Sequence, residues 1–241
     1  MRRIVFFNIA WMKYYKGIFR REENRNYKYF EEDIPVNGGS YIKRTGDAHE
    51  QFNFTPTYLD GNTLMDNPEG EYCLGFVETK TGVSGVPNQL HIERIDDSGV
   101  FKREEVIDDV TVVFCATPPN DKGTRVVGWY KNAYVFRNGA DVSFMDENGN
   151  DVYIQSLYAL ARAEDCVLLP EDVRKNKRDG NVWHVKRRSN GEDYGFGSSN
   201  VWFADKLEDP AVVEFRNRLI TNIDNYDGKN WLRRNPKILK Y

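Results

Sequence analysis

An acid–base pair at the end of one expected strand is the pattern closest to a catalytic site. Glu78 and Lys80 flank Thr79 where an apolar segment ends. Such a pair can hold a divalent metal and a positive partner for phosphodiester hydrolysis when another acid, such as Asp60 or Asp66, converges on it. Three-residue patterns also arise by chance in a chain with 29% charged residues, so an exposed strand-end pair is the competing interpretation. A metal-dependent DNA endonuclease is therefore an alternative hypothesis.

The remaining sequence has none of the usual catalytic or metal-binding spacings. His49, His91 and His184 lie outside any His-x-x-x-His or Cys-x-x-Cys pattern. No Gly-x-Ser-x-Gly elbow occurs, and the glycine-rich residues 194–200 lack the Lys-Ser/Thr ending of a phosphate loop. We therefore expect no catalytic residue, no metal and no cofactor, and a binding module rather than an enzyme.

Aromatic residues beside small polar residues form a second chemical pattern. In a strand over 125–130, Trp129 and Tyr130 point to opposite faces, so one can enter the core while the other borders a pocket. Stacking on an aromatic face contributes about 1 to 3 kcal/mol per base, and Asn or Ser side chains can read a base edge. The alternative is that these aromatics belong to the core. The candidate base pocket consists of Trp11, Trp129, Tyr130, Asn132, Ser199, Asn200 and Trp202.

Positive charge is concentrated in two stretches, although the chain has a net charge of −3. Residues 174–188 contain seven bases and one acid, a local charge of +6, and residues 229–240 contain five bases and no acid. Phosphate binding needs local rather than average positive charge, whereas a solvated loop and a frayed tail are the alternative. The candidate DNA-backbone residues are Arg174, Lys175, Lys177, Arg178, Lys186, Arg187 and Arg188.

Length and composition limit the class of protein. The chain has 241 residues, and its 14 Phe, 14 Tyr and 5 Trp are enough to fill the core of one large domain. No apolar run approaches the roughly 20 residues of a membrane span. Cys73, Cys115 and Cys166 lie far apart, which predicts reduced, mostly buried thiols. We expect a cytoplasmic protein that makes no membrane contact.

Short apolar segments separated by Gly, Pro, Asn and Asp predict a β-rich fold. Residues 117–123 predict a hairpin connection, because they contain two prolines and a glycine. One long helix is expected, with Asp209 as its cap, Pro210 at its first position and an apolar stripe reaching Ile223. A short helical turn is expected over 11–16 and an exposed turn over 146–150. Strands are expected over residues 3–8, 72–78, 90–95, 110–116, 125–130, 134–137 and 182–186.

These elements predict the α+β class, as a compact mixed β-barrel with flanking helices. Several sequence blocks also resemble a largely uncharacterised bacterial amino-terminal module, often fused to HNH endonuclease or other defence-related effector domains. The resemblance covers most of residues 1–204 and implies a PUA-like fold related to EVE and YTH domains, which hold a modified base in an aromatic-lined pocket. The blocks are residues 6–12, 38–41, 49–54, 75–77, 91–94, 126–137, 163–170 and 199–204.

The resemblance implies a nucleic-acid-reading domain over 1–204, with a helix and basic tail over 205–241 packed on it. Residues 205–241 contain no His-Asn-His nuclease pattern, so cleavage would require a partner such as an effector nuclease or NTPase. The leading hypothesis is a DNA-binding sensor that recognises a modified, flipped base in modification-dependent restriction or phage defence. A protein-interaction module of a defence complex, using the acidic residues 93–109, is a further alternative.

Overall fold

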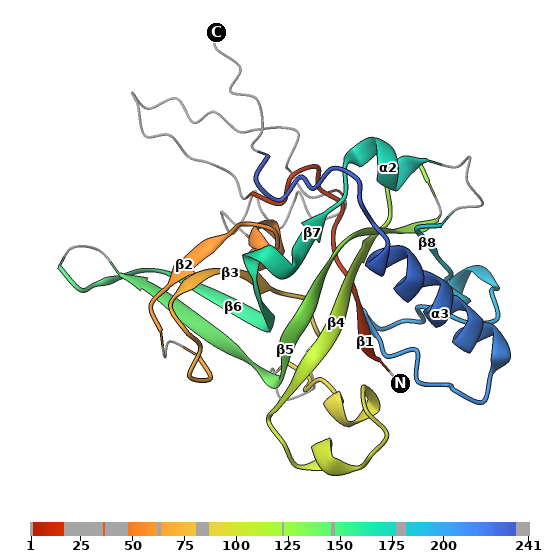
Figure 1. The fold of residues 1–241 in the computed structure, drawn as a ribbon, viewed down its shortest axis with the longest axis horizontal. Coiled ribbons are helices and arrows are strands. Elements are labelled where there is room, and N and C mark those ends of the chain that lie inside the picture. Colours follow the sequence, from red (N-terminus) through yellow and green to blue (C-terminus); the bar gives the residue numbers. More distant parts are fainter. Residues whose placement is uncertain are drawn as a thin grey trace, which may run out of the picture.

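A long, strongly bent sheet forms the centre of the molecule (Figure 1). The computed structural model describes residues 2–16, 36, 48–61, 64–80, 87–121, 123–145, 148–176 and 182–234. Its strands are β1 (Arg3–Asn8), β2 (Thr57–Leu59), β3 (Gly70–Gly75), β4 (Val106–Ala116), β5 (Thr124–Met145), β6 (Asp151–Arg162), β7 (Cys166–Leu168), β8 (His184–Val185) and β9 (Val201–Trp202). Its helices are α2 (Glu171–Lys175) and α3 (Pro210–Asp224), with short 3-10 turns η2 (His49–Phe52), η3 (Ile92–Arg94), η4 (Val100–Lys102), η5 (Ala163–Asp165) and η6 (Arg188–Asn190).

The described strands are ordered β2–β3–β6–β5–β4–β1–β9, and β7 and β8 also pair with β5. β1 runs parallel to β4, and the other pairs are antiparallel. The predicted α+β class with a dominant sheet is confirmed. The end strands β2 and β9 are not paired with each other within the described ranges, so the sheet there is open rather than closed into the predicted barrel.

The centre of the sheet is buried on both faces. Along β1, Val5 and Phe7 enter one apolar cluster, whereas Ile4 and Phe6 enter another on the opposite side. Successive side chains of a strand alternate between faces, so a strand buried on both sides reads as a continuous apolar run. This explains why the sequence predicts β1 over the same residues that the structure gives.

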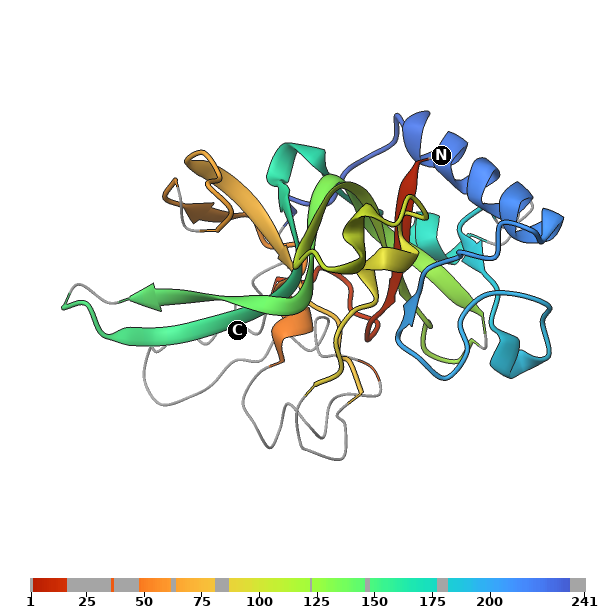
Figure 2. The ribbon, with the colours of Figure 1, turned by 90° about the horizontal axis from the view of Figure 1, so that it is seen from below.

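Helix α3 covers one face of this sheet, as its apolar spacing predicts (Figure 2). Asp209 caps the helix, because its Oδ1 accepts a hydrogen bond of 2.9 Å from the backbone N–H of Ala211. Val212, Phe215 and Leu219 are almost fully buried and pack in the same cluster as the β1 side chains on that face. The helix therefore positions its Phe215 turn directly over the sheet.

Strand β5 is longer than the sequence predicts. The expected break at Lys131 and Asn132 is wrong, because β5 continues through both residues. Asn132 has a left-handed φ of 50°, and the pairing shifts by one residue there, since Val110 faces Ala133 while Val112 faces Tyr130. The turn signal therefore marks a β-bulge within one strand.

Several other expected elements differ from the structure. The strand expected over 90–95 is wrong, because this segment contains the 3-10 turn η3 and buries Ile92 and Ile95 three residues apart. Residues 11–16 form no helical turn. The sequence does not predict strands β2, β6, β7 and β9. The three cysteines are buried free thiols, as expected.

The hairpin of β5 and β6 extends away from the body of the protein on the side opposite α3 (Figures 1 and 2). Its inner face carries Val142 and Leu157, which pack in a third apolar cluster with residues of β2 and β3. Residues 148–150 near its end are exposed, in agreement with the predicted turn, whereas residues 146 and 147 lie outside the described residues.

Gly128 is a point of close contact between β5 and its neighbours. A Cβ atom there would lie 2.3 Å from the Val167 carbonyl oxygen and 2.6 Å from the ring of Phe54. We expect Gly128→Ala to lower the free energy of unfolding by about 3 kcal/mol, because backbone and a buried ring must move. Urea unfolding measures the change. Gly197→Ala is the matched control, since its nearest atom lies at an ordinary 3.5 Å; an equal effect of both substitutions would contradict the packing argument.

Candidate functional site

Three aromatics of the candidate base pocket are core residues. Trp129 is 1% exposed and stacks on Trp183, with ring centroids 5.4 Å apart. Tyr130 has no exposed surface and donates its hydroxyl hydrogen to the Asn53 carbonyl oxygen. Trp11 is 4% exposed and lies in the same cluster as Tyr130, whereas Trp129 lies in the cluster on the other face. The structure therefore does not bring these three rings to one pocket.

The polar members of the candidate pocket hold loops together. Asn132 is exposed and donates to the Asp165 carboxylate at 3.1 Å. The Ser199 hydroxyl accepts from the backbone N–H of Val201 at 3.1 Å. Asn200 donates to the Glu78 carbonyl oxygen at 3.0 Å. These contacts are intramolecular and place Asn132 apart from the other two residues.

Trp202 has a different environment, because it is only half-buried. Its ring lies 4.7 Å from that of Phe6 and 5.6 Å from that of Phe215. It also stacks on Tyr194, with ring centroids 6.2 Å apart and ring planes 23° apart. Trp202 thus supports an aromatic layer that reaches the surface at Tyr194.

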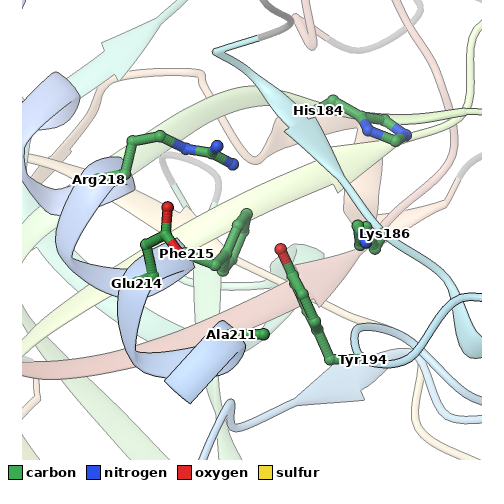
Figure 3. A pocket seen from close by; sticks show the side chains of 7 residues that line it. All are labelled: His184, Lys186, Tyr194, Ala211, Glu214, Phe215 and Arg218. Carbon is green, nitrogen blue, oxygen red and sulfur yellow. The ribbon is translucent and has the colours of Figure 1, made fainter. Parts of the chain in front are cut away.

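A cavity of about 390 Å³ opens beside this layer, between the end of β8 and helix α3 (Figure 3). Phe215 and Tyr194 provide aromatic surface, with ring centroids 5.5 Å apart. Glu214 and Arg218 extend from α3, while His184 and Lys186 come from the facing segment. The lining residues are His184, Lys186, Tyr194, Ala211, Glu214, Phe215 and Arg218.

Close backbone packing fixes Tyr194 at this position. Gly195 has a φ of 106°, and a Cβ atom there would lie 1.9 Å from the Lys186 carbonyl oxygen. The same oxygen accepts a hydrogen bond of 3.2 Å from the N–H of Phe196. Only glycine permits this approach, so the glycine-rich segment forms a tight turn that brings Tyr194 beside Lys186.

The polar groups of the cavity differ in charge. Burial, followed by the nearby Arg125, lowers the pKa of His184, so its imidazole is neutral near pH 7 and can both donate and accept hydrogen bonds. The ammonium of Lys186 lies 4.9 Å from the Tyr194 ring centroid and pairs with Glu192 at 3.0 Å. Arg218 lies 5.9 Å from the Phe215 ring centroid. The cavity therefore combines aromatic surface, two cations and one carboxylate.

In the first half of the basic stretch, Arg174 is buried and does not face solvent. Arg174 has no exposed surface, and its guanidinium donates to the carbonyl oxygens of Leu169, Met12 and Lys13 at 2.6 to 2.9 Å. It is therefore a structural residue rather than the predicted DNA contact. Lys175 pairs with Glu171 on the same helix. Lys177 and Arg178 lie outside the described residues.

The second half of the stretch is nearer the surface. Lys186 lines the cavity, and Arg188 is exposed. Arg187 is half-buried and donates to the side chains of Asn8 and Thr124 at 3.0 and 3.2 Å. In the later basic stretch, Arg233 pairs with Glu71, and residues 235–241 lie outside the described residues.

The residues of the alternative nuclease site do not form a metal centre. Glu78, Lys80, Asp60 and Asp66 are all exposed. Among the described residues, no group of three or more His, Cys, Asp or Glu side chains is arranged to hold a metal ion. Glu78 instead borders a separate cavity.

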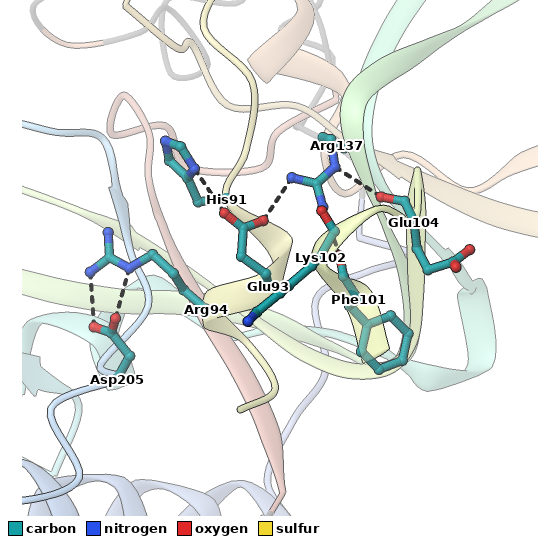
Figure 4. A network of polar contacts seen from close by, with 8 residues as sticks. All are labelled: His91, Glu93, Arg94, Phe101, Lys102, Glu104, Arg137 and Asp205. Atoms are coloured by element: carbon teal, nitrogen blue, oxygen red, sulfur yellow. Dashed lines mark hydrogen bonds and ion pairs between the residues drawn. The ribbon is translucent and has the colours of Figure 1, made fainter. Parts of the chain in front are cut away.

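The acidic residues 93–109 interact with bases of the same chain (Figure 4). Glu93 pairs with Arg137 at 2.7 Å, and Asp96 pairs with Arg3 at 2.8 Å. Burial opposes ionisation of Glu93, but hydrogen bonds from its own backbone and from Arg137 outweigh it and hold the pKa at about 2. A partner that used these two carboxylates would have to displace the arginines.

Glu50 is a titratable residue that does not belong to the candidate site residues predicted from the sequence. Its carboxylate accepts backbone N–H bonds from Ala10 at 2.8 Å and from Glu78 at 3.4 Å. Burial raises its pKa to about 7; the two backbone bonds oppose the shift, and the charge of Glu78 adds to it. The residue as a whole keeps some exposed surface. It joins the segments that follow β1 and β3.

No family model matches this chain, and searches of curated proteins and of solved structures also gave no match. In the part of the chain that the structure describes, no helix is long and apolar enough to cross a membrane. The residues that sequence reasoning missed, such as Tyr194, Phe215 and Arg218, come from separate segments. No local spacing indicates that these side chains share a cavity.

Glu50 makes stability depend on pH. Its pKa is about 7 in the folded protein and near 4.5 when unfolded, so between these values the folded state holds a proton that the unfolded state releases. This contribution of Glu50 to the free energy of unfolding is present below pH 4.5 and is lost as pH rises towards 7. The loss amounts to up to about 3 kcal/mol, at roughly 1.4 kcal/mol per pKa unit.

Urea unfolding of the wild type and of Glu50→Gln across this pH range measures the effect. Subtracting the free energies of unfolding of the variant from those of the wild type cancels the contributions of other titratable groups. One of these is His184, whose lowered pKa makes stability rise with pH. We expect the stability of the wild type relative to the variant to fall as pH rises. A difference that does not change with pH would show that Glu50 titrates normally.

Proposed function

We propose that this protein is a DNA-binding sensor module that admits a flipped, modified base to the cavity between β8 and α3. The observation that carries the proposal is the position of Tyr194 and Phe215 in a cavity of about 390 Å³ with Lys186 and Arg218 beside them. This volume lies within the range of roughly 300 to 1,000 Å³ typical of small-ligand pockets. The cavity replaces the predicted pocket around Trp11 and Trp129.

Tyr194 is the main candidate for stacking on a base. Its ring is partly exposed, whereas Phe215 is 2% exposed and serves as the floor. Burial raises the pKa of Tyr194, so its hydroxyl stays protonated and can donate a hydrogen bond. Stacking contributes about 1 to 3 kcal/mol per base. A ring backed by Trp202 needs little ordering when a base binds, because the layer is already packed.

The polar side chains of the cavity suit different parts of a nucleotide. Glu214 can accept hydrogen bonds from an exocyclic amino group of a base. Lys186 and Arg218 can contact phosphate, although Lys186 must exchange its Glu192 partner to do so. Arg188 adds exposed positive charge on the segment that follows Lys186. Phosphate contacts position the nucleic acid, and contacts within the cavity provide specificity.

The PUA-like architecture and the defence role are part of the same proposal. A sheet-rich α+β fold with a long helix against one face is compatible with them. In a modification-dependent restriction or phage-defence system, this chain would report the modified base, and an effector nuclease or NTPase would act as its partner. Base recognition needs no cofactor and no metal.

The proposal predicts separate effects for stacking and phosphate residues. Matched duplexes carry plain, methylated, hydroxymethylated or glucosylated cytosine, or methylated adenine, and binding is measured at two salt concentrations. Lys186→Gln and Arg218→Gln should weaken binding to every duplex and each reduce the slope of log affinity against log salt by about 1. Tyr194→Ala should lower the affinity for the preferred modified duplex by roughly 5- to 150-fold, equivalent to about 1 to 3 kcal/mol, and should thereby remove the preference over plain DNA.

Control variants separate these effects from changes in folding or net charge. Lys102→Gln and Arg103→Gln remove the same charges from exposed residues in and beside η4, and they should leave binding unchanged. Tyr194→Phe keeps the ring and loses only the hydroxyl, so it should retain the stacking contribution and most of the preference. Equal losses for plain and modified DNA with Tyr194→Ala would refute the base pocket, and weak binding by the wild type without any preference would refute the sensor function.

A further inference from the structure

A second cavity, of about 360 Å³, lies where β5 bends into its hairpin with β6. None of its described lining residues belongs to the cavity beside α3. One wall is the segment 76–79 after β3, and the other is formed by residues of β5 and β6. The lining residues are Phe76, Glu78, Thr79, Pro87, Asn138, Gly139, Ala140, Asp141, Ser156, Leu157 and Tyr158.

The backbone creates this cavity through an irregularity in β5. Val135 faces Ala159 of β6, whereas Ala140 faces Leu157, so β5 advances five residues while β6 advances two. Gly139 lies within this irregularity and has a φ of 75°, at which side chains other than glycine are strained. The displaced residues leave the regular ladder and form one side of the hollow.

Arg137 holds this irregularity in place (Figure 4). It is 8% exposed, and its guanidinium donates to the carbonyl oxygens of Glu104 and Phe101 at 2.8 and 2.7 Å and to the Glu93 carboxylate at 2.7 Å. Asn138 donates to the Glu105 carboxylate at 2.6 Å. Because a buried guanidinium must keep these partners, the bend is a fixed feature and the cavity exists before any ligand binds.

The described lining of the cavity combines aromatic walls with negative charge. The rings of Phe76 and Tyr158 have centroids 5.9 Å apart. Glu78 and Asp141 contribute two carboxylates, and the described part of the lining contains no Lys, Arg or His. Asp141 accepts one hydrogen bond, from the Ser156 hydroxyl at 2.7 Å, which leaves most of its acceptor sites available. Among the described residues, no cation pairs with Glu78 or Asp141.

We propose that this cavity binds a small organic cation that carries a primary ammonium or guanidinium group on a short aliphatic chain. A cation gains attraction from aromatic faces, and its N–H groups form charge-assisted hydrogen bonds with carboxylates. The aliphatic part contacts Leu157, Pro87 and Phe76. A bare metal ion is a poorer occupant, because the described residues offer no group of three metal-ligating side chains. This inference does not depend on DNA binding.

Calorimetric titration of the full chain with n-butylammonium and n-butylguanidinium tests the inference, with n-butanol and butyrate as neutral and anionic controls. The cations should bind in the millimolar range or tighter, at least tenfold more tightly than butanol, and added salt should weaken them. The proposal would be overturned if butanol bound as tightly as the cations. It would also be overturned if the cations showed no binding to the folded protein at millimolar concentration.

Isosteric variants identify the site. Glu78→Gln and Asp141→Asn should each weaken cation binding at least fivefold without changing the unfolding midpoint by more than a small amount, because both carboxylates lie on exposed residues. Glu164→Gln and Asp227→Asn remove charges from other exposed positions and should have no effect. Phe76→Leu should weaken binding of the cations more than it weakens binding of butanol. Binding that survives both carboxylate substitutions would show that the cations bind elsewhere.

Discussion

The pairing of strand β5 with its neighbours is the constraint on which the rest of the structure depends. β5 pairs with β4, β6, β7 and β8, and β4 in turn carries β1. The start of β5 holds β8 in place through the pairs Thr124–Val185 and Arg125–His184. Lys186 follows β8 and lines the cavity beside α3. Further along, the irregularity around Gly139 opens the second cavity. Both candidate sites therefore derive their geometry from one strand, so damage to its packing would affect both together.

Buried arginines join the segments around this strand. Arg174 connects α2 to the backbone after β1, and Arg216 connects α3 to the carbonyl oxygens of Ala204 and Arg2. Arg137 does the same for residues 101–104. A buried charge without partners is costly, so these side chains are committed to the fold. A run of bases in a sequence therefore overstates the charge available to phosphate, because the pattern does not distinguish an internal arginine from an external one.

The sequence predicts elements well where local signals and packing agree. β1 is an apolar run buried on both faces, and α3 has a cap at Asp209, a proline at its first turn and a regular apolar stripe. Prediction is poorer where tertiary contacts decide. Ile92 and Ile95 suggest a strand, but both side chains are buried from a 3-10 turn, and the Asn132 turn signal becomes a bulge. The open path of the described sheet also follows from pairings between distant segments, which no local pattern specifies.

The candidate sites were the least predictable feature, for a related reason. Residue type alone favours Trp129 as a pocket residue, yet this side chain is in the core, where it stacks on Trp183. Tyr194 instead reaches a cavity, because Gly195 allows a tight turn against Lys186. The two cavities also differ in charge: the one beside α3 has cations and aromatic rings, and the one at the β5 bend has carboxylates and aromatic rings. The net charge of −3 does not reveal this difference, because it sums the charges of the whole chain. The class of ligand that each cavity can bind is set by the few charged side chains that lie beside its aromatic rings. Only the folded chain brings those side chains together.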